Sequence, residues 1–377
     1  MSSTHDAKDA FGIELLQAIA IGLVVLAHGL MLALPTWPNL FVAFTLLSLF
    51  GIELLLLLAG FTIGAELIEL LQSRGRVRDF WRQRAWRMLP NYYLFLVLAC
   101  LLYSLLFKIF PGGWNYLWLG QSLLAPAANG FFPESWRIAI EVWFFLLAPL
   151  PLILIAQYLR DRSSAIPWFS LMLILSMPAL RMIYILDMHP AWDGGLRKIT
   201  LLRPDALAWG MLFCYWKLRN PVPWEKHAGK MAAAGFAILL PCAMYAMGLA
   251  NRGNVSLSST NDAIFSAALF SFLPAGLACL LPLLDRWLVP CSAGLRAVVS
   301  SLSRYSYALY FAHIPLLFVL LYCARDAIKD QPSLILFAGF GWIILSMVAA
   351  ALVFRFFEEP LRRFGTARVA SKNDSTA

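Results

Sequence analysis

The chain has 377 residues, 61% of them hydrophobic and 14% charged, with a formal net charge of +9 at neutral pH. This composition excludes an ordinary soluble domain, because so much apolar surface must face lipid. The basic residues alternate between successive connections instead of forming one patch, so the charge indicates membrane topology and no nucleic-acid partner.

Ten apolar segments follow along the chain, each close to the roughly 20 residues that a helix needs to cross the hydrocarbon core. Lipid offers backbone groups no hydrogen-bond partner, so every span is expected to be helical. The expected spans are 11–34, 41–71, 88–109, 137–157, 167–187, 200–217, 231–250, 262–284, 299–324 and 333–356. The sequence predicts an all-α, polytopic bundle in one membrane domain, residues 1–365, and a polar, disordered tail, residues 366–377.

The first span is expected to be retained. Charged residues precede it, Glu14, Gln17 and His28 lie within it, and no small-residue cleavage site follows, unlike a signal peptide. The connections on the side of the N-terminus carry most of the Arg and Lys. The positive-inside rule therefore predicts that both termini are cytoplasmic and that the number of helices is even.

Two segments interrupt this regular pattern. Residues 74–90, RGRVRDFWRQRAWRMLP, are basic and aromatic, which indicates an amphipathic helix ahead of the third span; anchoring to anionic lipid is one explanation. Residues 110–136 contain too many Gly, Pro and Asn to span and are too apolar to float free, so they are expected to form an outer cap or a re-entrant loop. The six cysteines are far apart, with no C-x-x-C and no His/Cys cluster, so we expect neither a disulfide framework nor a metal site.

Ionisable side chains inside spans are costly unless they are paired or face water, so each is a candidate for function. His28 and His313 lie at similar depths in two outward-running helices, Glu53 lies near the midplane, and the others lie at outer helix ends. A single polar chamber in the outer half of the membrane is expected from His28, Glu53, Glu141, Arg203, Asp205 and His313. The alternatives are that the histidines only pack and that the acids form structural ion pairs.

Helical phase adds two groupings. Gln17 and His28 are eleven residues apart, about three turns, so they project from nearly the same face, with Glu14 close to it. Arg84 and Arg87 are three residues apart and are also neighbours on one face.

Several short motifs together resemble acyltransferase family 3, the polytopic bacterial O-acyltransferases that act on glycans. In chain order they are IELLQAIAIGLVVLAHG from Ile13, GIELLLLLAGFTIG from Gly51, FWRQRAWRMLPNYY from Phe80, WRIAIEVWFF from Trp136, LRPDALAWG from Leu202, SRYSYALYFAHIP from Ser303 and FEEPLRRF from Phe357. The chain departs from the family pattern at Gln17, where a cation is usual, at Glu53, where Asp is usual, and at Arg137, where Ser is common. No hydrolase-like domain follows the last span, which suggests a stand-alone form.

The resemblance implies transfer of an acyl group, by default acetyl, from cytoplasmic acetyl-CoA (acyl-CoA) to a hydroxyl of a cell-envelope glycan or lipid-linked glycan, such as a lipopolysaccharide O-antigen or an exopolysaccharide. It also implies a multi-pass protein of the bacterial inner membrane, in contact with membrane lipids. A sugar hydroxyl is a poor nucleophile, so a neutral His that takes its proton fits this chemistry.

The expected roles follow from these motifs. The catalytic residues are expected to be His28, Glu53, Glu141 and Glu14, with His28 as the base and Glu53 or Glu14 orienting it. Arg84 and Arg87 are expected to bind the CoA phosphates, because a guanidinium pair suits phosphate. The substrate-binding residues are expected to be Arg203, Asp205, His313 and Trp136. Direct transfer and an acyl-histidine intermediate both remain open.

The alternative function is a transporter or flippase, in which the buried His and Glu residues would form a proton relay or a substrate path. A transporter predicts internal pseudo-repeats, and none is visible in the sequence. A scaffold protein is a third possibility, but it gives no reason for the basic pair and the His/Glu set to occur together.

Overall fold

The structure, a computed structural model, describes residues 3–111, 113–127, 130–253, 255–285, 292–328 and 331–364. The expected polar tail, residues 366–377, lies outside the described residues. Within the described ranges the chain is a bundle of helices, and the only β-type pairing is an isolated bridge between Ala191 and Ser256.

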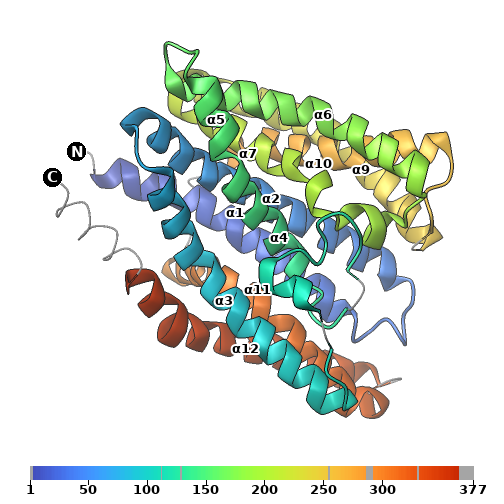
Figure 1. The fold of residues 1–377 in the computed structure, drawn as a ribbon. Coiled ribbons are helices and arrows are strands. Elements are labelled where there is room, and N and C mark those ends of the chain that lie inside the picture. Colours follow the sequence, from blue (N-terminus) through green and yellow to red (C-terminus); the bar gives the residue numbers. More distant parts are fainter. Residues whose placement is uncertain are drawn as a thin grey trace.

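The long helices follow the predicted spans closely (Figure 1). They are α1 (Ser3–Leu30), α2 (Leu40–Ser73), α3 (Val77–Phe107), α4 (Ser135–Leu147), α5 (Pro149–Ala156), α6 (Ala165–Met188), α7 (Pro204–Arg219), α8 (Pro221–Lys226), α9 (Ala228–Arg252), α10 (Thr260–Asp285), α11 (Ala293–Ile328) and α12 (Pro332–Val353). Short helical turns are η1 (Trp114–Trp118), η2 (Arg162–Ser164), η3 (Trp192–Arg197), η4 (Thr200–Leu202) and η5 (Phe354–Glu358). The fourth predicted span is divided between α4 and α5, where Pro149 begins the second piece.

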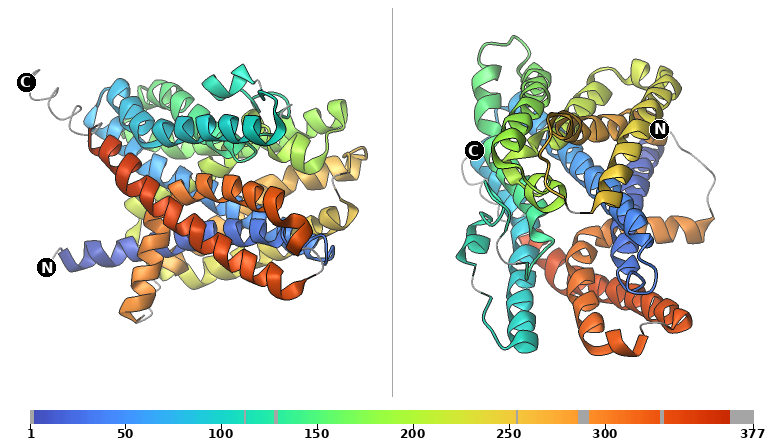
Figure 2. Two further views of the ribbon diagram at one scale, coloured as in Figure 1. Left: turned by 90° about the horizontal axis from the view of Figure 1, so that it is seen from below. Right: turned by 90° about the vertical axis from the view of Figure 1, so that its right-hand side faces the viewer.

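Within the described ranges, nine helical segments are long and apolar enough to cross a membrane. The sixth expected span is α7, which has only 16 residues and packs against α2 and α6. Helix α1 begins and η5 ends at the same end of the bundle (Figures 1 and 2). A chain that starts and finishes at one end crosses the bundle an even number of times, so we count α7 as the tenth crossing.

The basic segment 74–90 is not a separate surface helix, because α3 begins at Val77, eleven residues before the expected start of the third span. Helix α3 runs without a break from Val77 through Pro90 to Phe107. A proline removes one backbone hydrogen bond, a loss that neighbouring helices can offset in a membrane bundle. The charge of Arg84 is accommodated because Glu66 of α2 pairs with it.

The described residues between α3 and α4 form a compact connection instead of a span, as the sequence predicts. The backbone N–H groups of Thr200 and Leu201 donate to the carbonyls of Ser122 and Leu123, at 2.7 and 3.3 Å. Phe132 of the same connection is almost fully buried. This connection therefore packs onto the bundle and places the start of α4 beside η4.

Helices α2 and α7 approach each other closely at two glycines. A Cβ atom added at Gly60 would lie 2.1 Å from the carbonyl oxygen of Leu207, and one added at Gly210 would lie 2.1 Å from that of Leu57. Small residues allow such backbone contact between membrane helices. The contact fixes α7, with Arg203 at its N-terminus, against the middle of α2.

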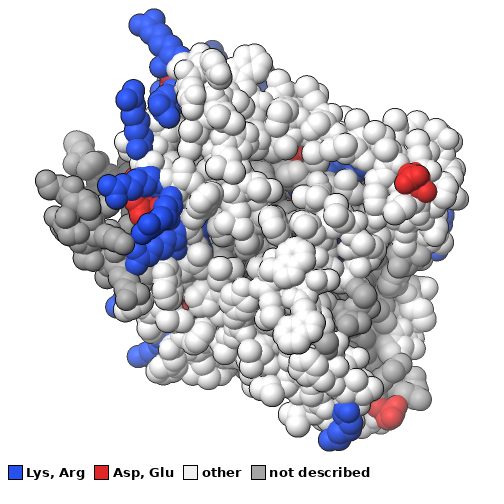
Figure 3. Space-filling model, viewed as in Figure 1, with Lys and Arg blue, Asp and Glu red and all other residues white. Residues whose placement is uncertain are grey.

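Charge is distributed unevenly over the surface (Figure 3). On the face shown, Lys and Arg side chains gather at the end where α1 begins and η5 ends, and the broad middle is nearly uncharged. This pattern matches a protein whose middle faces hydrocarbon and whose one end meets water and lipid headgroups. The chain is a multi-pass membrane protein.

Candidate active site

A cavity of about 1060 Å³ lies at the end of the bundle where α1 begins and η5 ends. It is rich in arginine, with seven arginines and four glutamates in its wall, so positive charge exceeds negative by three. The charged residues are Glu14, Arg84, Arg87, Arg137, Glu141, Arg304, Arg355, Glu358, Glu359, Arg362 and Arg363. Guanidinium groups in such a number favour an anionic ligand, and their planar fork suits phosphate oxygens.

Arg84 and Arg87 lie on one face of α3, as their spacing predicts, and share Glu66. The Arg84 Nε donates to Glu66 Oε2 at 2.5 Å, and the Arg87 Nη1 lies 3.8 Å from Glu66 Oε1. Arg84 is buried and its Nη2 has no hydrogen-bond partner, whereas the Arg87 side chain is 47% exposed. One carboxylate thus holds two guanidinium groups at the cavity wall and leaves donors for a ligand.

Two histidines meet deeper in the bundle. The rings of His28 on α1 and His313 on α11 have centroids 5.0 Å apart, and His313 Nε2 lies 3.4 Å from His28 Nδ1. The sequence placed these residues at similar depths, and their contact agrees with that expectation. His313 is fully buried and His28 is partly buried.

The hydrogen bonds of the pair define which nitrogen is basic. His28 Nδ1 lies 2.8 Å from the Val24 carbonyl oxygen, and His313 Nδ1 lies 2.9 Å from that of Leu309. A carbonyl only accepts, so the Nδ1 of each neutral ring carries the proton and each Nε2 carries a lone pair. The lone pair of His313 Nε2 faces His28 Nδ1–H, which leaves His28 Nε2 as the nitrogen available to accept a proton from a substrate.

A pocket of about 210 Å³ surrounds the histidine pair on the side away from the arginine-rich cavity. Trp136 and Tyr310 contribute to its wall, together with a charged group formed by Asp193, Arg197 and Lys198. Burial by itself raises the pKa of Asp193, but Lys198 and Arg197 outweigh this effect and hold that pKa at about 2. The group therefore carries one net positive charge beside the histidines.

Glu134 also lines this pocket, immediately before α4. Its side chain is buried, and neither carboxyl oxygen has a hydrogen-bond partner. Burial raises the pKa of this carboxyl to about 8. Most Glu134 carboxyl groups are thus protonated at neutral pH, and a protonated carboxyl can both donate and accept a hydrogen bond.

Arg137 and Tyr310 lie between the arginine-rich cavity and the histidine pocket. The Arg137 guanidinium, which pairs with Glu141 in the arginine-rich cavity, lies 4.3 Å from the centroid of the Tyr310 ring. The Tyr310 ring in turn lies 6.0 Å from that of His313 in the pocket. The arginine-rich cavity and the histidine pair are therefore separated by a thin layer of side chains.

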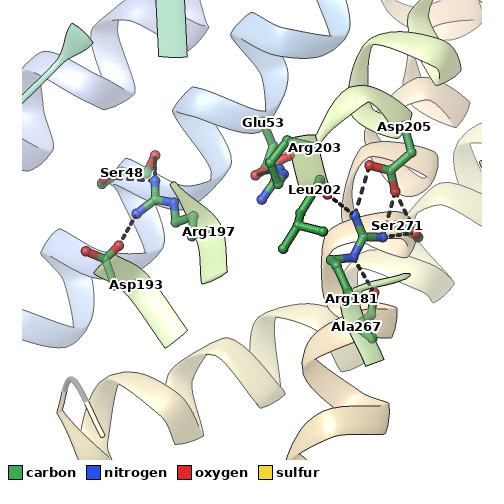
Figure 4. Close-up of polar contacts among 10 residues, drawn as sticks. All are labelled: Ser48, Glu53, Arg181, Asp193, Arg197, Leu202, Arg203, Asp205, Ala267 and Ser271. Carbon is green, nitrogen blue, oxygen red and sulfur yellow. Dashed lines mark hydrogen bonds and ion pairs between the residues drawn. The ribbon is translucent and has the colours of Figure 1, made fainter. Parts of the chain in front are cut away.

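Three of the expected site residues form buried ion pairs and line neither the arginine-rich cavity nor the histidine pocket (Figure 4). Arg203 donates to Glu53 and lies over the Phe270 ring. Asp205 accepts from Arg181 at 2.7 and 3.0 Å. Glu53, Arg203 and Asp205 line neither space described above, and all three are fully buried.

The expected single chamber is therefore divided. His28, His313 and Trp136 line the small pocket, and Glu14, Glu141, Arg84 and Arg87 line the large cavity. Neither Glu53 nor Glu14 contacts the His28 ring: Glu14 accepts from Ser300, and Glu53 accepts from Arg203. His28 is oriented by a backbone carbonyl and by His313.

Gln17, which stands where the family pattern usually has a cation, joins α1 to α11. Its amide nitrogen donates to Ser306 at 2.7 Å, and its oxygen accepts from Ser303 at 3.2 Å. Eleven residues separate it from His28, or about 16 Å along the helix. Gln17 therefore fixes helix packing at the large cavity and does not contact the histidine.

Sequence reasoning missed Glu66, Arg181, Arg197 and Glu134. Arg181 lies inside an apolar span, and that position alone marks it as an intramembrane charge that needs a partner. Glu66 lies about two turns from the end of α2, where an acid resembles an ordinary surface residue. Arg197 and Glu134 lie in connections, where sequence gives no depth. Among the described residues, no group of His, Cys, Asp and Glu is arranged to hold a metal ion.

The bundle defines a polytopic membrane protein that holds a histidine pair close to an arginine-rich cavity. Residues 11–355 match the acyltransferase domain of the acyltransferase 3 family. This match covers most of the chain, so the chain belongs to acyltransferase family 3. The histidine pair and both cavities are formed largely by residues within the matched range.

Among curated proteins, the chain is similar to the O-acetyltransferase OatA of Staphylococcus aureus strains NCTC 8325, COL and MRSA252. It is 22% identical to each over 347 residues, which covers 84% of this chain and 53% of the relative. The chain thus spans about half the length of the curated relatives it matches. No solved structure matches it.

Proposed function

We propose that this protein transfers an acetyl group from acetyl-CoA to a hydroxyl of a cell-envelope glycan, in the bacterial inner membrane with both termini cytoplasmic. The observation that carries the proposal is the arrangement of His28, with an available Nε2, close to an arginine-rich cavity at the end of the bundle where α1 begins and η5 ends. The similarity to O-acetyltransferases supports the choice of acetyl and of a hydroxyl acceptor.

The donor enters from the cytoplasmic end. The CoA phosphates bind Arg84 and Arg87, and the arginines of α11 and η5 that line the same cavity add positive charge. The pantetheine arm extends past Arg137 and Tyr310 and presents the thioester to the histidine pair. The ion pair between Glu141 and Arg137 holds this guanidinium in place.

The acceptor hydroxyl occupies the smaller pocket, across the layer of Arg137 and Tyr310 from the donor cavity. As its hydroxyl oxygen attacks the thioester carbonyl, His28 Nε2 takes the hydroxyl proton. This attack forms the C–O bond and converts the carbonyl oxygen to an oxyanion. Collapse of the tetrahedral intermediate re-forms the carbonyl of the new ester, breaks the C–S bond and releases CoA, whose thiolate takes the proton back from His28. A positioned base of this kind contributes about 10²–10⁴-fold to the rate.

The proposal is tested by mass spectrometry of envelope glycans from cells with and without the gene. We expect an increment of one acetyl group that disappears on deletion, returns with the wild-type gene and does not return with His28→Ala. His227→Ala is the matched control, because His227 lies outside both spaces, and it restores the increment. Identical glycans with and without the expressed protein would refute the proposed acceptor class.

Binding of radiolabelled acetyl-CoA to the purified protein tests the donor separately. We expect saturable binding that unlabelled CoA displaces. Binding of acetate without CoA, or no binding at all, would refute the proposed donor.

A further inference from the structure

A second groove joins the histidine pocket from the side. It encloses about 670 Å³ between residues 31–35, which follow α1, the second half of α3, residues 130–134 and the second half of α11. This volume lies within the range of about 300–1,000 Å³ that is common for small-molecule sites. Glu134 and Ile314 line both spaces, so the groove and the pocket share a wall.

The groove is apolar along almost all of its length. Its lining includes Leu102, Leu106, Phe318 and Leu321, and its single charged residue is Glu134, at the end next to the histidines. Hydrocarbon gains about 0.8 kcal/mol per methylene when it leaves water, and an apolar wall favours such a chain over a sugar. The groove thus suits a molecule with a long apolar part and a polar part that begins at Glu134.

The outer wall of the groove belongs to the lipid-facing surface. Phe107 and Tyr322, which line it, are 52% and 58% exposed, and their rings pack edge to face at 6.3 Å. The ends of α3 and α11 lie side by side there (Figure 1), where the Tyr322 hydroxyl donates to the Leu106 carbonyl at 3.4 Å. A chain can therefore enter from the bilayer without passing the arginine-rich cavity.

The acetyl donor does not explain this groove, because an acetyl group has no chain to fill it. Like the apolar lining of the groove, the unpaired carboxyl group of Glu134 points to a ligand. A buried carboxyl group with two unpaired oxygens is costly, and a hydroxyl-bearing headgroup at the junction would satisfy it.

We propose that the groove binds the hydrocarbon chain of a lipid-linked glycan, and that Glu134 hydrogen-bonds to the headgroup of this acceptor and positions its hydroxyl beside His28. The inference rests on the proposed function and specifies its acceptor class. The bilayer supplies the acceptor laterally, and the cytoplasmic cavity supplies the donor, so the two substrates meet at the histidine pair from different directions.

The test uses full-length protein in lipid nanodiscs with radiolabelled acetyl-CoA and two acceptor fractions from cells that lack the gene. One is the glycolipid fraction extracted with organic solvent, and the other is the water-soluble glycan fraction. We expect label in the glycolipid fraction. Leu102→Trp, which fills the groove, should raise the KM for the glycolipid about tenfold or more and leave the acetyl-CoA Kd unchanged. Leu101→Trp is the matched control, because Leu101 is 55% exposed, lies next to Leu102 and does not line the groove.

Glu134 is tested in the same assay. Glu134→Leu should raise the acceptor KM about tenfold with an unchanged acetyl-CoA Kd, and Glu134→Gln should recover most of the affinity, since an amide also donates and accepts. Equal KM values for Leu102→Trp and wild type, or label only in water-soluble glycans, would overturn the inference and leave the proposed function intact. No label in either fraction with the wild-type protein would instead overturn the proposed function.

Discussion

Two regions of the bundle use buried charge in different ways. Around α2, α6, α7 and α10, each arginine is matched by a carboxylate inside the protein, as in the pairs Arg203–Glu53 and Arg181–Asp205. Around α1, α3, α4 and α11, arginines face a large cavity and a histidine keeps an available nitrogen. The comparison teaches that an intramembrane charge indicates a reactive site only where it also faces a space that a ligand can enter.

The largest effect is expected from breaking the paired region. Arg203→Ala leaves Glu53 buried without a counter-charge, which costs about 3–5 kcal/mol of folding free energy. Unfolding of the detergent-solubilised protein measures this loss. The double variant Arg203→Ala/Glu53→Ala, which leaves no unpaired charge, should be more stable than the single variant. If Arg203→Ala were as stable as wild type, the Arg203–Glu53 pair would have no structural role and the distinction between the two regions would be wrong.

In the cavity region, Arg87→Ala should leave folding stability nearly unchanged and weaken acetyl-CoA binding. A charge-assisted hydrogen bond contributes about 1.5–3 kcal/mol, or roughly 10–100-fold in affinity. Titration of the purified protein with labelled acetyl-CoA gives the Kd. Arg219→Ala is the matched control, because Arg219 is a partly exposed arginine that pairs with Asp161 and does not line the cavity. Equal Kd values for the two variants would contradict a role of Arg87 in donor binding and would favour lipid anchoring as its role.

Asp193 combines features of both regions. It forms ion pairs with Arg197 and Lys198, and it lines the pocket beside the histidines. Its pKa, held at about 2, is below the ordinary value, so its carboxylate stabilises the fold above about pH 4, and this stability is lost as the pH falls toward 2. Asp193→Asn should cost on the order of 2 kcal/mol at pH 7. Thermal unfolding at pH 7 and pH 3 should show the gap between wild type and variant narrowing at the lower pH. A gap that is constant with pH would contradict the ion pairing.

The smallest of these effects concerns the histidine pair itself. His313→Ala removes the group that faces His28 Nδ1 but keeps the basic Nε2, so we expect the transfer rate to fall roughly tenfold, as for one lost hydrogen bond. His28→Ala should cost much more, because it removes the base. Rates with saturating donor and acceptor compare the two. A larger loss of transfer rate for His313→Ala than for His28→Ala would contradict these roles and would make His313 the base.

Periodicity and composition predicted the fold well, because lipid forces both helical structure and span length. The contact of His28 with His313 was within reach of the sequence, since depth in a span follows from counting residues. The N-terminal boundary of α3 could not be predicted from the sequence. A basic segment that contains proline indicates a break between helices, and only the structure shows that Glu66 pairs with Arg84. The partners of Glu53 and Asp205 were also missed, since Arg203 lies 150 residues from Glu53 and its rotation about the helix axis is not encoded locally.

The sequence by itself determined that this chain is a polytopic helical membrane protein of acyltransferase family 3 and which residues carry charge into the membrane. These properties follow from local quantities, namely hydrophobic length, charge and short motifs. Only the tertiary structure decided which charges face a cavity and which are paired, and that Glu134, in a connection, lies beside the histidines. Those facts depend on how α1, α3, α4 and α11 rotate and cross, and close packing of the whole bundle sets that geometry.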